Sequence, residues 1–212
     1  MQTATNTAGD FYTAKIRARY TLSNRSSLDE DREALIDELR ICLNDPRSAT
    51  PESFEKYGVA TLVEFLSKSH AFYINYALPS LQRSINELIR SEPQMIILER
   101  ASRLLMHGFT EELTNHFTHE ETYLFKYAMQ LSVGQKTTAI PYSLCQFRAE
   151  HGAFSVDIEK VITLFEMYRV ELAGNMAYRI VVQQLENLKA DMDLHGLIED
   201  QVLLPKIEKL ES

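Results

Sequence analysis

The chain has 212 residues, of which 45% are apolar, so it is long enough for one domain with at most a small appendage. Seven Gly and six Pro argue against a fold rich in strands or loops. The net charge of −8 disfavours sequence-independent binding of nucleic acid, which needs a basic surface. We therefore expect a globular protein that does not bind nucleic acid.

The sequence shows no sign of a membrane span, of a signal peptide or of an oxidising compartment. No apolar run approaches the roughly 20 residues of a membrane span, and the N-terminal MQTATNTAGD lacks the apolar core of a signal peptide. Cys42 and Cys145 lie far apart, which indicates neither a disulfide framework nor a paired-cysteine metal site. We expect a cytoplasmic protein with no membrane partner.

Residues 1–57 are predicted to form an N-terminal arm followed by a short helix. Ser27 is placed to cap the segment LDEDREALIDELRICL, whose first turn is acidic, as the helix dipole prefers. The segment NDPRSATPESF then interrupts the chain. This region would be a small helical extension that covers one end of the main domain, and its packing stays open.

Residues 58–212 are predicted to form four long amphipathic helices, because apolar positions recur at steps of three and four. The four series are Val63, Leu66, His70, Tyr73 and Ala77; Met106, Phe109, Leu113, His116, Glu120, Tyr123 and Tyr127; Leu144, Phe147, His151, Phe154, Ile158, Val161 and Phe165; and Tyr178, Val181, Leu185, Leu188, Met192, His195, Glu199 and Val202. Helix breakers separate them at 91–93, 132–136 and 173–175. Short connections favour an all-α, up-down-up-down antiparallel four-helix bundle.

Each predicted helix carries one histidine on its apolar face: His70, His116, His151 and His195. In an antiparallel bundle, two residues share a depth when they lie equally far from the turn that joins their helices. The midpoints of successive histidines are (70+116)/2 = 93, (116+151)/2 = 133.5 and (151+195)/2 = 173, and each falls on a turn signal. The four imidazoles should therefore lie in one layer of the interior.

Two carboxylates join this layer, because Glu120 and Glu199 each follow a histidine by four residues and face the same way. Buried carboxylates without a partner are expensive, which argues against a metal-free structural bundle. Six ligands suit two cations, with two histidines on each and both carboxylates bridging. Residue type alone leaves Fe, Zn, Cu and Ni open.

For other polar side chains near the layer, the sequence gives weaker evidence of a role at the metal site. His107 lies on the opposite side of the helix from His116, and His119 lies about 60° from the His116 direction. Both are expected at the surface or at a boundary, and His119 is also a candidate to support the ligands. Tyr73 and Tyr123 share the ligand faces, and Glu121 and Glu150 adjoin ligands in sequence. Each of these four is a candidate to support the ligands, and core packing or a solvated helix face explains them as well.

The pattern resembles the hemerythrin-like (HHE cation-binding) bundle, and more narrowly the di-iron proteins that repair iron–sulfur clusters, the repair-of-iron-centres family. The matching segments are LVEFLSKSHAFYINYALPSL, HFTHEETYLF, FRAEHGAF and HGLIEDQVLLP, spread over about residues 58–210. The resemblance implies the metal ligands His70, His116, Glu120, His151, His195 and Glu199. Oxygen-carrying hemerythrins place a second histidine where this chain has Ser155, which favours the repair-type site.

By resemblance, the cofactor is an oxo- or hydroxo-bridged pair of iron ions, for which Zn or Mn could substitute. The implied function is a response to nitrosative or oxidative stress, by donating iron to damaged iron–sulfur proteins or by reducing nitric oxide. The alternative is a non-catalytic sensor of oxygen or nitric oxide, or a metal store, so enzymatic activity and oligomeric state stay open. Many repair proteins carry an N-terminal cysteine motif, whereas residues 1–57 here contain only Cys42.

Overall fold

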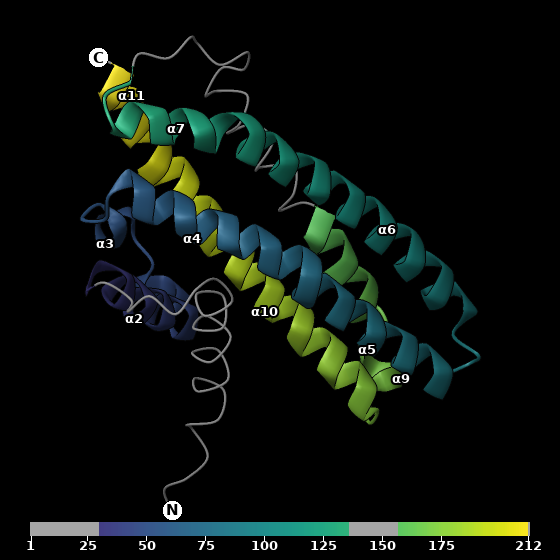
Figure 1. Cartoon of the computed structure of the whole chain (residues 1–212). Helices are drawn as coiled ribbons and strands as arrows, with labels where there is room; N and C mark the ends of the chain where they lie inside the picture. The colour runs from purple at the N-terminus through teal and green to yellow at the C-terminus, as the bar shows by residue number, and fades with distance from the viewer. Residues whose placement is uncertain (1–29, 136–156, 212) are drawn as a thin grey trace, which may run out of the picture. The chain divides into compact units, whose positions relative to one another are not determined.

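A computed structural model describes residues 30–135 and 157–211, and within these ranges all regular structure is helical (Figure 1). The named elements are α2 (Glu30–Asn44), the 3₁₀ turn η1 (Pro46–Ser48), α3 (Pro51–Phe54), α4 (Val59–Phe72), η2 (Tyr73–Ala77), α5 (Leu78–Ser91), α6 (Ile96–His119), η3 (Glu120–Leu124), α7 (Phe125–Ser132), α9 (Arg169–Leu172), α10 (Met176–Ile198), η4 (Glu199–Leu203) and α11 (Leu204–Glu211). Residues 157–166 are also helical. The expected all-α class is confirmed for the described residues, whereas the up-down-up-down topology stays a prediction.

The chain divides into two compact units, and the boundaries fall inside α4 and α10. Among the described residues, the first unit holds 30–69, 125–135 and 194–211, and the second holds 70–124 and 157–193. The predicted domain boundary near residue 58 is a different division and stays a prediction. It coincides with a helix start, because α4 begins at Val59 directly after Gly58.

In the first unit, ion pairs join α2 to α4. Arg32 donates from Nε and from a terminal nitrogen to Oε2 of Glu64, at 2.9 and 2.6 Å, while Lys68 lies 2.6 Å from Oε1. Burial opposes ionisation of Glu64, but the hydrogen bonds from Lys68 and Arg32 prevail and lower its pKa. The apolar face of α2 is buried through Leu35, Ile36, Leu39 and Cys42. The predicted N-terminal helix is therefore present, although Ser27 lies outside the described residues.

The second unit is built on a core that α5, α6, residues 157–166 and α10 share. α5 and α6 contact each other and are joined by the short segment at residues 92–95, so they run in opposite directions (Figure 1). Asn175 caps α10, because its side-chain oxygen accepts hydrogen bonds from the backbone N–H groups of Ala177 and Tyr178 at 2.8 and 3.2 Å. Its amide nitrogen donates to Glu92 at 2.7 Å, which ties the start of α10 to the end of α5.

In the part of the chain that the structure describes, three π-helical segments interrupt the long helices. η2 follows His70 by three residues, η3 begins at Glu120, and η4 begins at Glu199. Each π-helical segment takes one residue more than an α-helical turn, so the buried face shifts by one position after it. This shift explains why Ala77, predicted on the apolar face, is half-buried, whereas Leu78 is buried. π-helical segments are frequent at functional sites, and these three adjoin predicted ligands.

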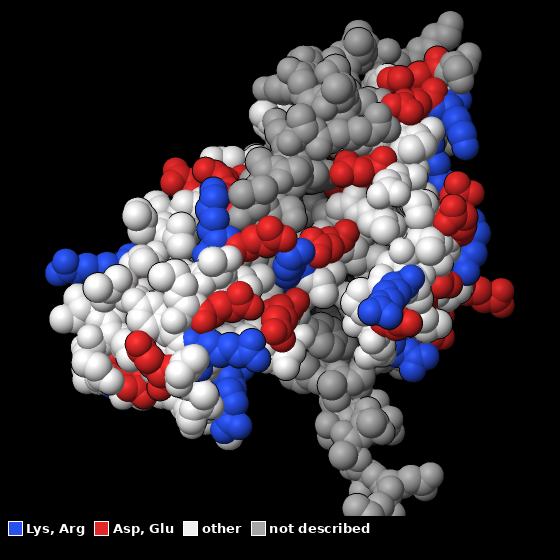
Figure 2. Space-filling view, turned by 180° about the vertical axis from the view of Figure 1, so that it is seen from behind, with Lys and Arg blue, Asp and Glu red and all other residues white. Residues whose placement is uncertain are grey.

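The surface is mixed in charge. On the face seen in Figure 2, the described Lys and Arg side chains lie among Asp and Glu side chains rather than in a broad basic area. None of the helices in the described ranges combines the length and the apolar character that crossing a bilayer requires.

Candidate metal centre

His116 and Glu120 lie at the junction of α6 and η3, deep in the second unit. Nε2 of His116 lies 2.6 Å from Oε1 of Glu120, and both side chains are buried, the glutamate completely. The four-residue spacing in an α-helix brings the two groups onto one face, as the sequence predicted. The pair sits at the last turn of α6, where the helix changes to a π-helical segment.

His70 lies close to the other oxygen of the same carboxylate. Its Nε2 lies 3.3 Å from Oε2 of Glu120, so one buried carboxylate is flanked by two buried imidazoles. His70 lies on α4 and His116 on α6, and both reach Glu120, which agrees with the depth expected from their shared midpoint at residue 93. Two imidazole nitrogens and the two oxygens of one carboxylate therefore come together within the second unit.

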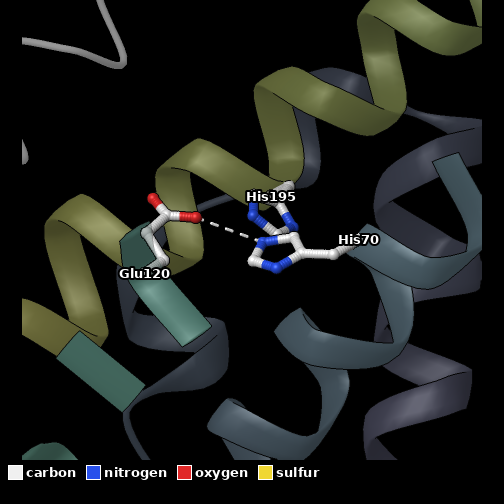
Figure 3. Close-up of side chains that lie close together, drawn as sticks. All are labelled: His70, Glu120 and His195. Carbon is white, nitrogen blue, oxygen red and sulfur yellow. Dashed lines mark ion pairs between the residues drawn. The ribbon is translucent and has the colours of Figure 1, made fainter. Parts of the chain in front are cut away.

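The second histidine–glutamate pair repeats this arrangement on α10 and η4. Nε2 of His195 lies 3.4 Å from Oε2 of Glu199, and Glu199 is completely buried. Figure 3 shows the side chains of His70 and Glu120 in the second unit pointing toward one another, with their ion pair dashed.

The donor chemistry of these residues fits a metal ion. A buried carboxylate loses its hydration, which costs several kcal/mol unless a positive charge compensates it. Imidazole nitrogens with carboxylate oxygens are the ligands that Fe, Mn and Zn take in helical bundles. Such donors lie at buried positions in both units. The second unit holds His70, His116 and Glu120, and the first unit holds His195 and Glu199. Bound cations would thus compensate two carboxylates that the fold otherwise holds at a cost.

The remaining predicted residues differ in what the structure says of them. His151, Glu150 and Ser155 lie outside the described residues, so the ligand role predicted for His151 stays a prediction.

His107 is 78% exposed and lies 3.8 Å from Glu111, as expected for a surface residue. His119 is half-buried and packs edge-on against Tyr123, with ring centroids 5.5 Å apart, as expected for a boundary residue.

Tyr73 is completely buried, and its hydroxyl donates to a carboxylate that the sequence analysis did not single out. The hydroxyl lies 3.1 Å from Oδ1 of Asp191 and 3.2 Å from the Asp191 carbonyl oxygen. Asp191 precedes His195 by four residues, so the periodicity that selected Glu199 could also have found it. The stacking of Phe117 on His70 had no such signal, because it depends on packing between helices.

Comparison with known proteins agrees with this geometry. Neither a search of curated proteins nor a search of solved structures gave a match. The family model described as the hemerythrin HHE cation binding domain matches residues 61–207, which is more than half of the chain. The match includes all six predicted ligand positions and begins two residues after the start of α4. The chain therefore belongs to the hemerythrin HHE cation binding domain family.

Proposed function

We propose that this protein is a non-haem di-iron protein of the nitrosative and oxidative stress response, which repairs iron–sulfur clusters. The observation that carries the proposal is the completely buried Glu120 carboxylate between the imidazoles of His70 and His116, at 3.3 and 2.6 Å. At such a site a bound cation would compensate the buried negative charge, whereas an apolar structural core has no charge to compensate. The family match supports cation binding by a domain that spans residues 61–207 and so includes these residues.

The ligand set that we propose has two halves. His70, His116, His151 and His195 would each give one nitrogen, and Glu120 and Glu199 would give carboxylate oxygens. His151 enters through its spacing and through the family match, because the described residues do not include it. We propose that the four helices bearing these histidines form an up-down-up-down bundle, with residues 1–57 as an N-terminal extension.

When bound, two iron ions supply redox chemistry and coordination positions for nitric oxide or oxygen. The chain's own residues hold the cations, and their burial excludes bulk water from the ligand atoms. Damaged iron–sulfur proteins are the proposed partners, with iron as the cargo. We propose that this activity takes place in the cytoplasm, because two cysteines far apart in the sequence fit a reducing compartment.

The first experiment measures iron. The wild-type chain would be reconstituted anaerobically with Fe²⁺, desalted and analysed for metal, and we expect two irons per chain. His116→Ala and Glu120→Ala should lose most of the iron. His107→Ala is the matched control, because it removes an exposed histidine from the same helix and should keep the full content. Full iron content in the His116 and Glu120 variants would overturn the proposed ligand set.

The second experiment separates repair from sensing. The diferrous protein would be mixed with nitric oxide in a stopped-flow instrument and, separately, with an apo iron–sulfur protein. Nitrous oxide formed over many turnovers supports reduction, and iron transfer that restores the cluster supports donation. A stable nitrosyl with neither outcome would overturn the repair function in favour of a sensor or a metal store.

A further inference from the structure

One stretch at the junction of α6 and η3 holds the His70 ring on three sides. Phe117 stacks on its face, with ring centroids 3.8 Å apart and planes 12° from parallel. Oε2 of Glu120 lies 3.3 Å from Nε2. Oε1 of Glu121 lies 3.1 Å from Nδ1. Both nitrogens of one imidazole therefore face carboxylates that are consecutive in the sequence.

The two carboxylates differ in their surroundings. Glu120 is completely buried and also meets His116, whereas the side chain of Glu121 is 48% exposed. Both belong to the first turn of η3, where the helix leaves α-helical geometry. The inner carboxylate lies where a metal ligand is expected. The outer carboxylate lies at the opposite edge of the same ring, where it cannot share that role.

The stacked Phe117 fixes the plane of the imidazole but not its direction in that plane. A ring turned by half a revolution about its bond to Cβ keeps the same stacking and exchanges the positions of nitrogen and carbon. An ionised carboxylate oxygen only accepts hydrogen bonds, so the contact at 3.1 Å assigns the hydrogen to Nδ1 of His70. The other nitrogen, Nε2, then keeps its lone pair for a metal ion.

We propose that Glu121 is a positioning residue of the metal centre: its hydrogen bond to Nδ1 of His70 fixes the ring so that Nε2 faces the cation. This inference rests on the proposed function and assigns a role to a residue outside the ligand set. An acceptor on the second nitrogen of a ligating histidine sets its tautomer and orientation and raises its basicity. Loss of such a partner typically weakens metal binding by about 10- to 100-fold.

Three variants test the role. Glu121→Ala removes the acceptor, Glu121→Gln replaces the carboxylate by an amide oxygen that still accepts, and Glu111→Ala is the matched control. Glu111 is a glutamate on α6 that lies 3.8 Å from the exposed His107. The Fe²⁺ affinity of each would be measured anaerobically by competition with a chelator. We expect a loss of about 10- to 100-fold in E121A, a smaller loss in E121Q, and no change in E111A.

A spectroscopic readout addresses the tautomer directly. The chain would be labelled with ¹⁵N and loaded with Zn²⁺, a diamagnetic stand-in for iron, and the His70 ring nitrogens would be followed by long-range ¹⁵N–¹H spectra. We expect hydrogen on Nδ1 in the wild type and in E121Q. In E121A that hydrogen should exchange rapidly with water, because its acceptor is gone.

The outcomes separate this inference from the function on which it rests. If the wild type binds metal and E121A binds it as tightly, Glu121 has no positioning role, while the metal centre stands. Equal losses in E121A and E121Q would also overturn the inference, because charge rather than hydrogen bonding would then be responsible. A wild-type chain that takes up neither Fe²⁺ nor Zn²⁺ would overturn the metal centre and this inference together.

Discussion

Oε1 of Glu120 lies 2.6 Å from Nε2 of His116, and the glutamate side chain has no exposed surface. The pair occupies a position where a helical bundle normally packs leucine. Its burial costs free energy in the metal-free protein, and a bound cation would reverse that balance. The relation between charge, burial and metal can be tested at this one residue.

Glu120→Gln keeps the shape of the side chain and removes its charge. In the metal-free protein, we expect the midpoint temperature of unfolding to stay the same or to rise, because a buried charge is gone. In the wild type, a metal at about 100 times its dissociation constant adds about 2.7 kcal/mol, or about 5–10 °C for a chain of this length. The variant should lose this gain, which calorimetry with and without Fe²⁺ would measure.

The control for this prediction is Glu111→Gln, an exposed position on the same helix, which should keep the full metal-dependent gain. A Glu120→Gln variant that is strongly destabilised without metal would argue that the carboxylate is held by the fold alone. A variant that keeps the metal-dependent gain would argue that Glu120 is not a ligand.

The apolar periodicity predicted much of this geometry, because burial in a helix follows a simple repeat. His70, His116, His195, Glu120 and Glu199 were selected by steps of three and four, and all five are buried. The breakers were equally informative: α5 ends at Ser91, α7 at Ser132 and α9 at Leu172, each at a predicted turn. These features depend on the local order of residues, which can be read directly from the sequence.

Features that depend on contacts between helices were not predictable in this way. The repeat does not show the π-helical segment η2, so it placed Ala77 on the face that Leu78 occupies. It named Glu121 only as a neighbour of a ligand, since a contact with Nδ1 of His70 depends on how two helices pack. The position of His151 relative to the other ligands stays a prediction from spacing.

Tyr73→Phe tests the buried contact with Asp191. The variant removes a hydroxyl that donates at 3.1 Å to the buried carboxylate of Asp191. Removing one partner of a buried hydrogen bond costs about 1–3 kcal/mol, so we expect a loss of this size in the free energy of unfolding in urea. Tyr76→Phe is the control, because Tyr76 is half exposed and should change stability by less than about 0.5 kcal/mol. Equal effects would show that the hydroxyl contributes nothing specific.

Cys42 is predicted to react slowly in the folded protein. Burial raises the pKa of its thiol above the ordinary value, against a smaller opposing hydrogen bond from Ser48. Less thiolate is then present at pH 8 than in a free cysteine, and the sulfur is also covered. In a Cys145→Ser background, alkylation should be slow, should accelerate with pH beyond the ordinary thiol range, and should become fast in urea. Rapid alkylation of the folded protein at neutral pH would contradict this and would reopen a role for Cys42 in iron transfer.

Asn175→Ala is predicted to weaken the fold without changing the metal centre. Its side-chain oxygen accepts from the backbone N–H groups of Ala177 and Tyr178, and such a cap contributes about 0.5–2 kcal/mol. Asn175→Ser keeps a capping oxygen and loses the amide that donates to Glu92, so its smaller loss in urea unfolding would isolate the cap from that contact. His195, the ligand predicted on α10, lies twenty residues beyond Asn175 (195 − 175 = 20), so Fe²⁺ affinity in the folded variants should match the wild type. If a variant keeps its stability but loses iron, the start of α10 would act on the position of the ligands rather than on the stability of the fold.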